Sequence, residues 1–367
     1  MKTNALIRAS RFFLAALFVA APLTIAVRAD QSQFVNAKVE GRALNQGLAN
    51  TIQQIANQAQ GPAWIAYEVA AVPGDYSSCC NYQRNGSLCG TCNLEEQHGT
   101  STVTSTQNNT VKLEQPAQVI MLLRVDEKRV MRMRVYSSNC ILDAGGLSVF
   151  WLTGARPDES VAFLTQFVAG KSLEGEGDDH LPQQALMAIA QHADPSADRA
   201  FASFVAPDQP ASLREKASFW LGAARGRTGL ALLEKMATND PNSDVRAKVA
   251  FALFVSHEPQ ATDDIIRMAK DDSDAHVRGQ ALFWLAQKAG QKAASTIIGA
   301  IQNDPDTEVK KKAVFALTQM PKGEGVPKLI EVAQSNKNPE VSKQAMFWLG
   351  QSHDPRALAF FEQILSQ

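Results

Sequence analysis

The sequence lacks features of two classes of protein: those that span a membrane and those that bind nucleic acid. After about residue 30, no apolar run approaches the roughly 20 residues that a membrane-spanning helix needs. Lysine and arginine together number 36 against 37 aspartate and glutamate residues, which gives a formal net charge of −1. A phosphate backbone is bound by a strong basic field, which this balance does not supply. We therefore expect no nucleic-acid partner and no membrane span in the mature chain.

Signatures of the common catalytic sites are also missing. The chain has no Gly-x-Ser-x-Gly elbow, no phosphate-binding loop, no His-Glu-x-x-His pair and no dinucleotide fingerprint. Carboxylate pairs such as Asp263-Asp264 and Asp271-Asp272 lie at expected helix starts and turns, where acidic residues act as capping charges. The sequence thus favours a non-catalytic protein without a cofactor.

Residues 1–29 have the pattern of a secretory signal. Lys2, Arg8 and Arg11 form a basic start, and an apolar, almost uncharged stretch leads to a small-residue cleavage site at Ala29. An uncleaved N-terminal anchor is the alternative interpretation. Cleavage removes four basic and no acidic residues, so the formal charge of the mature chain falls to about −5. We expect a periplasmic or secreted protein.

The chain from residue 181 to its last residue repeats with a period of 32. Six copies begin at Leu181, Leu213, Val245, Val277, Val309 and Val341. Positions 1, 5, 8 and 9 of each copy are apolar, which is the spacing of a helix with one buried stripe. A second apolar helix follows in each copy, so each unit is a helix pair that buries its face against its neighbours. Five residues before four of the starts lies a residue that we expect to end one helix and cap the next: Asp240, Asp272, Asp304 or Asn336.

The turn Asp-Pro-x-x-x-Val, followed by Arg or Lys and then Ala-x-x-Ala-Leu, resembles the short HEAT-like repeat of the type found in phycobilisome lyases. It matches best over 240–253 and 304–317. The resemblance implies an all-α solenoid over 181–367 that binds a protein partner. A lyase role would need a chromophore and a cytoplasmic partner, and the export signal argues against it.

Position 7 of the first helix departs from that pattern, because it is usually charged in such repeats. Here it is Met187, Phe219, Phe251, Phe283, Phe315 and Phe347 in the six copies. It lies roughly 140° from the centre of the buried stripe. Position 8 alternates between tryptophan and alanine, as Trp220, Ala252, Trp284, Ala316 and Trp348. The favoured interpretation is that these large and small side chains interleave between stacked copies to fill the core, and it is favoured more strongly for Trp284 than for the phenylalanines. An exposed aromatic ridge that contacts a partner is the alternative.

Residues 30–170 break the repeat and predict a small α+β domain with an antiparallel sheet. Residues 171–180, rich in glycine and acidic residues, read as a linker. The expected elements are a helix over 44–55, a strand over 64–69, a hairpin of 119–125 and 129–136 around a three-residue loop, a strand over 147–152 and a helix over 158–168.

All five cysteines lie in this N-terminal domain, and none lies in the repeats. They are Cys79, Cys80, Cys89, Cys92 and Cys140. In an exported protein, two disulfides with one thiol left over are the first interpretation, and their connectivity stays open. Cys79 or Cys80 with Cys89, Cys92 and His98 could instead bind zinc. That site would belong to an enzyme or a metal-dependent regulator, the alternative function. A redox role for the pair Cys89 and Cys92 is a further possibility.

Overall fold

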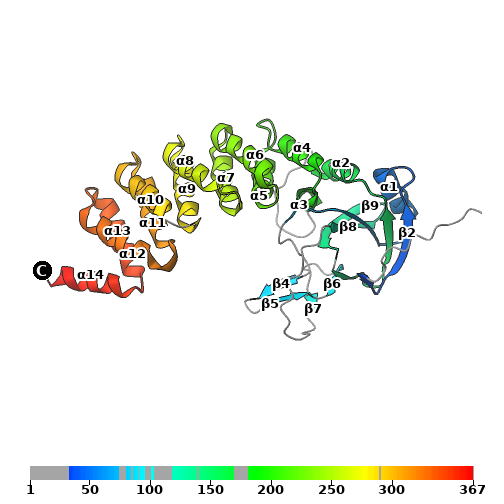
Figure 1. The fold of residues 1–367 in the computed structure, drawn as a ribbon, viewed down its shortest axis with the longest axis horizontal. Helices are drawn as coiled ribbons and strands as arrows, with labels where there is room; N and C mark the ends of the chain where they lie inside the picture. The colour runs from blue at the N-terminus through cyan, green and yellow to red at the C-terminus, as the bar shows by residue number, and fades with distance from the viewer. Residues whose placement is uncertain are drawn as a thin grey trace, which may run out of the picture.

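A computed structural model describes residues 33–73, 80–83, 86–89, 91–95, 101–102, 118–138, 140–168, 181–288 and 291–366. The expected signal segment 1–29 and linker 171–180 lie outside these residues. Figure 1 shows a β-rich N-terminal part followed by an arched row of helices. The fold class is as predicted, an α+β part followed by an α solenoid. Within the described ranges, no helix is long and apolar enough to cross a membrane.

The main sheet of the N-terminal part has five strands in the order β2-β11-β3-β8-β9. Their bounds are Lys38–Ala43, Ser148–Thr153, Ala63–Ala70, Gln118–Asp126 and Arg129–Ser137. Strand β11 runs parallel to both β2 and β3, and only β3, β8 and β9 pair antiparallel. The prediction of an antiparallel sheet was therefore wrong for half of it. Helix α1 (Leu48–Gln58) connects β2 to β3 as a crossover, which allows parallel strands, and the distant β11 enters between them.

The β8–β9 hairpin is tighter than predicted. Asp126 pairs with Arg129, so the loop has two residues instead of three. Glu127 and Lys128 have φ values of 47° and 63°, as in the turn that matches the twist of a hairpin. A register shift between Arg124 and Val125 marks a β-bulge near the turn.

The two faces of this sheet bury different partners. Helices α1 and α2 (Pro157–Val168) contribute to the core on the face that carries Ile65 and Tyr67. The opposite face carries Trp64 and Trp151 and shares a core with a small sheet of order β1-β10-β6-β7. Those strands are Phe34–Val35, Ile141–Asp143, Thr91–Asn93 and Ser101–Thr102, and a separate hairpin pairs β4 (Cys80–Gln83) with β5 (Gly86–Cys89).

The solenoid consists of six helix pairs, as the period predicts. The first helices are α3 (Leu181–Gln191), α5 (Ala211–Ala224), α7 (Ser243–Val255), α9 (Ala275–Lys288), α11 (Thr307–Thr318) and α13 (Pro339–Gln351). The second helices are α4 (Pro195–Phe204), α6 (Gly226–Asn239), α8 (Ala261–Asp271), α10 (Gln291–Asn303), α12 (Gly325–Ser335) and α14 (Pro355–Leu365). From α5 to α13, each first helix packs against the first helix of the next copy. The first helices therefore form one layer along the row.

Buried ion pairs connect the turns of successive copies. Arg214, Arg246 and Arg278 each donate two hydrogen bonds, of 2.8 to 3.0 Å, to an aspartate 26 residues later. These acceptors are Asp240, Asp272 and Asp304. They end helices, as predicted, but they do not cap the following helix. The capping side chain belongs to the residue two positions later: Asn242, Asp274, Asp306 or Asn338. Each aspartate instead accepts a hydrogen bond from the backbone N–H of that capping residue, in addition to the two from the arginine.

The N-terminal part packs directly on the solenoid, and one apolar cluster runs through both. The end of β3 bonds to the chain after α3, where Val72 N donates to Gln191 O and Ala193 N donates to Ala70 O, both at 2.9 Å. A buried chain of side chains crosses the same junction. The Ser160 hydroxyl lies 2.8 Å from the Tyr67 hydroxyl and 2.9 Å from Nε2 of His192. This chain joins β3, α2 and the first repeat.

We predict that acid weakens the junction through His192. Burial lowers the pKa of His192 to about 4 from the ordinary 6.5. Between these values the unfolded chain binds more protons, so stability is complete above about pH 6.5 and is lost as the pH falls towards 4. The full loss is about 3.5 kcal/mol, 2.5 pKa units at about 1.4 kcal/mol each, of which about 2 kcal/mol falls between pH 7 and pH 5. Urea unfolding at pH 7 and pH 5 measures it.

The matched variant is His192→Gln, whose side-chain amide can replace the hydrogen bond to Ser160 but does not titrate. We expect its free energy of unfolding to fall less between pH 7 and pH 5 than that of the wild type. Equal losses in the two proteins would assign the pH dependence to other groups.

Candidate functional site

Aromatic side chains line the first-helix layer from α5 to α13. We call them the aromatic row: Phe219, Trp220, Phe251, Phe254, Phe283, Trp284, Phe315, Phe347 and Trp348. Successive position-7 rings stack in pairs, with 5.9 Å between the ring centroids of Phe219 and Phe251 and 6.1 Å between those of Phe283 and Phe315. Trp284 connects the two pairs, because its ring lies 4.6 Å from Phe251 and 4.9 Å from Phe283. The row is therefore continuous over five copies.

The position-7 phenylalanines of the row lie outside the buried core, whereas Phe254 packs against it. Phe219, Phe251, Phe283 and Phe315 are half-buried, and Phe347 is 53% exposed. The favoured prediction of core packing was wrong for this column. Position 7 lies on the far side of the helix from the buried stripe, so its contacts are to the same position in the next copy. Trp220, Trp284 and Trp348 are also half-buried, but they do pack against the core cluster.

Lysines precede four of the five position-7 phenylalanines by one helical turn; the copy of Phe283 has Gly279 and Gln280 there. Positions 3 and 4 lie on the same side of the helix as position 7, and they hold Lys216, Lys248, Lys311, Lys312 and Lys343. Glu215 is the one acidic residue at these positions. Acidic residues in the first turns, such as Asp244 and Glu340, are seven residues before the phenylalanine of their helix. At 1.5 Å per residue, they lie about 10 Å from the ring along the helix axis. Lys311 is paired with Glu308 at 3.0 Å, and the other lysines make the surface next to the rings mainly cationic.

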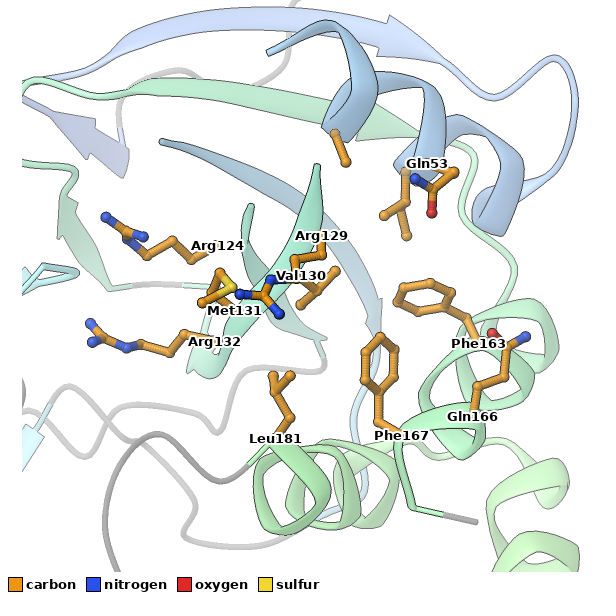
Figure 2. Close-up of a pocket in the computed structure, with 12 residues that line it drawn as sticks. Gln53, Arg124, Arg129, Val130, Met131, Arg132, Phe163, Gln166, Phe167 and Leu181 are labelled. Carbon is orange, nitrogen blue, oxygen red and sulfur yellow. The ribbon is translucent and has the colours of Figure 1, made fainter. Parts of the chain in front are cut away.

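A pocket of about 700 Å³ lies at the other end of the molecule, between the β8–β9 hairpin and the helices α1, α2 and α3. Figure 2 shows its lining, with Phe163, Phe167 and Leu181 on the helix side of the hairpin and the guanidinium groups of Arg124 and Arg132 on the opposite face of the sheet, where Arg124 pairs in register with Trp64. Nothing in the sequence pattern singled out this pocket. Its walls come from segments that are far apart in the chain.

The structure places only some of the predicted cysteine ligands. Cys79 and His98 lie outside the described residues. Cys80 and Cys89 are directly opposite each other in the β4–β5 hairpin, while Cys92 is buried in the second core cluster as a free thiol. Among the described residues, no three histidine, cysteine or acidic side chains gather as a metal site would require. The zinc site and the redox pair therefore stay hypotheses.

The sequence profile of HEAT repeats matches residues 199–286 and 294–367. The C-terminal half is a HEAT-repeat solenoid. The profile leaves the N-terminal part unassigned, and no curated protein matches the chain.

Solved structures share parts of this solenoid at low identity. Human deoxyhypusine hydroxylase is 15% identical, with a TM-score of 0.27, over 56% of this chain and 90% of its own. The complex of CpcE and CpcF of phycocyanin lyase from Nostoc is 22% identical, with a TM-score of 0.33, over 43% of this chain and 100% of the matched chain. Kap121p is 13% identical, with a TM-score of 0.36, and this chain covers 25% of it. Scores this low carry no argument about function.

We predict that Phe283 and Trp284 differ in what they contribute to stability. Phe283→Ala removes ring contacts on the surface, so it should cost about 1 kcal/mol, the range for aromatic pairs. Trp284→Ala also removes packing on the core and should cost about 3 kcal/mol. Urea unfolding of the two variants checks this. A larger loss of stability for Phe283→Ala than for Trp284→Ala would show that the phenylalanine column packs in the core.

We also predict one free thiol in the denatured, unreduced protein, and assign it to Cys92. Burial raises the pKa of this thiol to about 11, so it should not react with a thiol reagent in the native protein at pH 8. The other four cysteines form two disulfides in this account. Cys92→Ala should reduce the count to zero. Four or five free thiols together with bound zinc would favour the metal site.

Proposed function

We propose that the protein is an exported, non-catalytic scaffold that binds a protein partner along the aromatic row. HEAT-repeat solenoids are typical of protein-interaction scaffolds, because stacked repeats present a long continuous surface. The observation that carries the proposal is the continuity of half-buried rings over five copies, ending at the exposed Phe347. Aromatic residues contribute most of the energy in many protein interfaces. The disulfide-containing N-terminal part serves as a second contact module in this proposal.

The charges beside the row indicate the chemistry of the partner. Lys216 and Lys248 are exposed one turn before Phe219 and Phe251. A partner that covers both the rings and the lysines presents apolar side chains flanked by carboxylates. Such charge complementarity mainly increases the rate of association and is screened by salt. The proposed partner is therefore a protein with an acidic, apolar segment.

The double variant Phe283→Ala and Phe315→Ala tests the proposal. It removes one stacked pair from the middle of the row, and we expect capture of the partner from the native envelope fraction to fall at least about tenfold, as loss of hot-spot residues does. The matched control is Phe361→Ala, a half-buried phenylalanine on α14 outside the row.

Circular dichroism confirms that all three proteins are folded before capture is compared. Equal capture by the double variant and the wild type would exclude the row as the binding face. An equal loss with Phe361→Ala would show that the effect is not specific to the row.

A further inference from the structure

The last helix pair, α13 and α14, has an apolar outer face that no other described element covers. Figure 1 shows this pair at the far end of the row from the β-rich part. On α14, Leu358, Ile364 and Leu365 are 63%, 41% and 86% exposed. Together with Phe347 of α13, they are four of the six large apolar side chains that are exposed in the described residues. The exposed apolar surface is therefore concentrated at this end of the solenoid.

The inner copies, two to five, bury most residues at the repeat positions of Leu358 and Ile364. The buried equivalents, multiples of 32 residues earlier, are Leu230, Ala294, Val326, Met236, Met268 and Val332. The other two equivalents, Thr262 and Ala300, are half-buried. Each inner pair is followed by another copy, and α14 is the last helix of the described chain. Burial of Leu358 and Ile364 therefore needs a further element that stacks on the last pair.

The α13 side of the same face is also open. A Cβ atom at Gly222 of α5 would clash with the backbone oxygen of Ala252 in α7, so the helices of these neighbouring copies touch there. Gly350 holds the equivalent position in α13, and a Cβ atom there would meet open space. Both helices of the last pair thus present the surface that the inner copies use for stacking. A repeat that ends a solenoid usually has a polar outer face instead.

The opposite end of the solenoid is already covered. Helix α2 packs on α3 and α4, and strand β9 packs on α3. The backbone N–H of Met133 on β9 also donates a hydrogen bond of 2.6 Å to the Gln184 side chain of α3. A second chain therefore cannot stack its first copy on α14 without displacing its own N-terminal part. The equivalent surface that it can offer is its own last pair.

We propose that two copies of this chain dimerise end to end through the outer faces of their last helix pairs. A contact between identical surfaces has twofold symmetry and closes with two chains, whereas head-to-tail stacking builds an open filament. Burial of the exposed leucine and isoleucine side chains drives the association.

The charges beside the face permit two copies to meet. Lys343 lies two helical turns before Gly350, and Glu362 lies one turn after Leu358, so both exposed residues border the face. Because these charges have opposite signs, two identical faces do not repel each other through a shared charge. The dimer carries two aromatic rows, one on each chain.

Sedimentation equilibrium of the chain from residue 30 onwards, over a range of concentrations, tests the proposal. We expect a monomer–dimer equilibrium that reaches twice the mass of one chain and no more. Leu358→Lys places a charge from each copy in the interface, and we expect the dimer dissociation constant to rise at least about tenfold, as when a central interface residue is lost. Since Leu358 is mostly exposed in the single chain, the variant should still fold.

Gln363→Lys is the matched control. It adds the same charge at an exposed position on the other side of α14, and it should dimerise like the wild type. Circular dichroism confirms that both variants are folded. The proposal is overturned if the wild type is monomeric at every concentration, if its mass rises beyond two chains, or if Leu358→Lys dimerises as tightly as the wild type. Equal weakening by the two lysine variants would also overturn it, because net charge would then control the association.

Discussion

Each helix pair of the solenoid buries its apolar stripe against the next pair, and this shared interface determines the geometry of the whole C-terminal half. Residues at position 1, such as Val245, Val277 and Val309, are fully buried in successive copies. Because the interface repeats every 32 residues, any other position with the same period is also brought into line. The stacked phenylalanines and the buried Arg–Asp pairs are both consequences of that regular spacing.

The ion pairs specify how the turns of neighbouring copies meet. Arg246 donates to Asp272 of the next turn and also to the backbone oxygen of Asp240 in its own turn, at 2.9 Å. Removing one partner of such a buried pair leaves an uncompensated charge, which typically costs about 3 to 5 kcal/mol. In the next copy, Lys310 and Asn336 occupy the positions of the arginine and the aspartate, so this ion pair does not form there. Lys310 instead donates a hydrogen bond to the backbone oxygen of Gln302. The register of the last copies is therefore maintained mainly by apolar packing.

The sequence predicted the solenoid well because its period is local and in phase. In the N-terminal part, both helices and four strands of the main sheet were predicted, but its edge strand β2 and the short strands were not. The strand order was not predicted either, because β11 enters between β2 and β3 from about 80 residues away. For the aromatic row, the sequence identified the residues but favoured the wrong environment. Hydrophobicity alone does not show whether Phe283 packs on the core or on Phe315. Phe254 was missed because position 10 carries no repeated aromatic residue, and the pocket residue Arg129 lies in a hairpin with no motif around it.

Deletion of residues 277–308 tests the central claim, the 32-residue phase of the shared interface, most directly. This deletion removes one period, joins His276 to Val309 and leaves Phe251 one copy before Phe315, so we predict a shortened protein that remains helical and soluble. Deletion of 277–292 removes half a period and brings the wrong faces together, so we predict loss of helicity by circular dichroism. Equal behaviour of the two deletion variants would contradict the account.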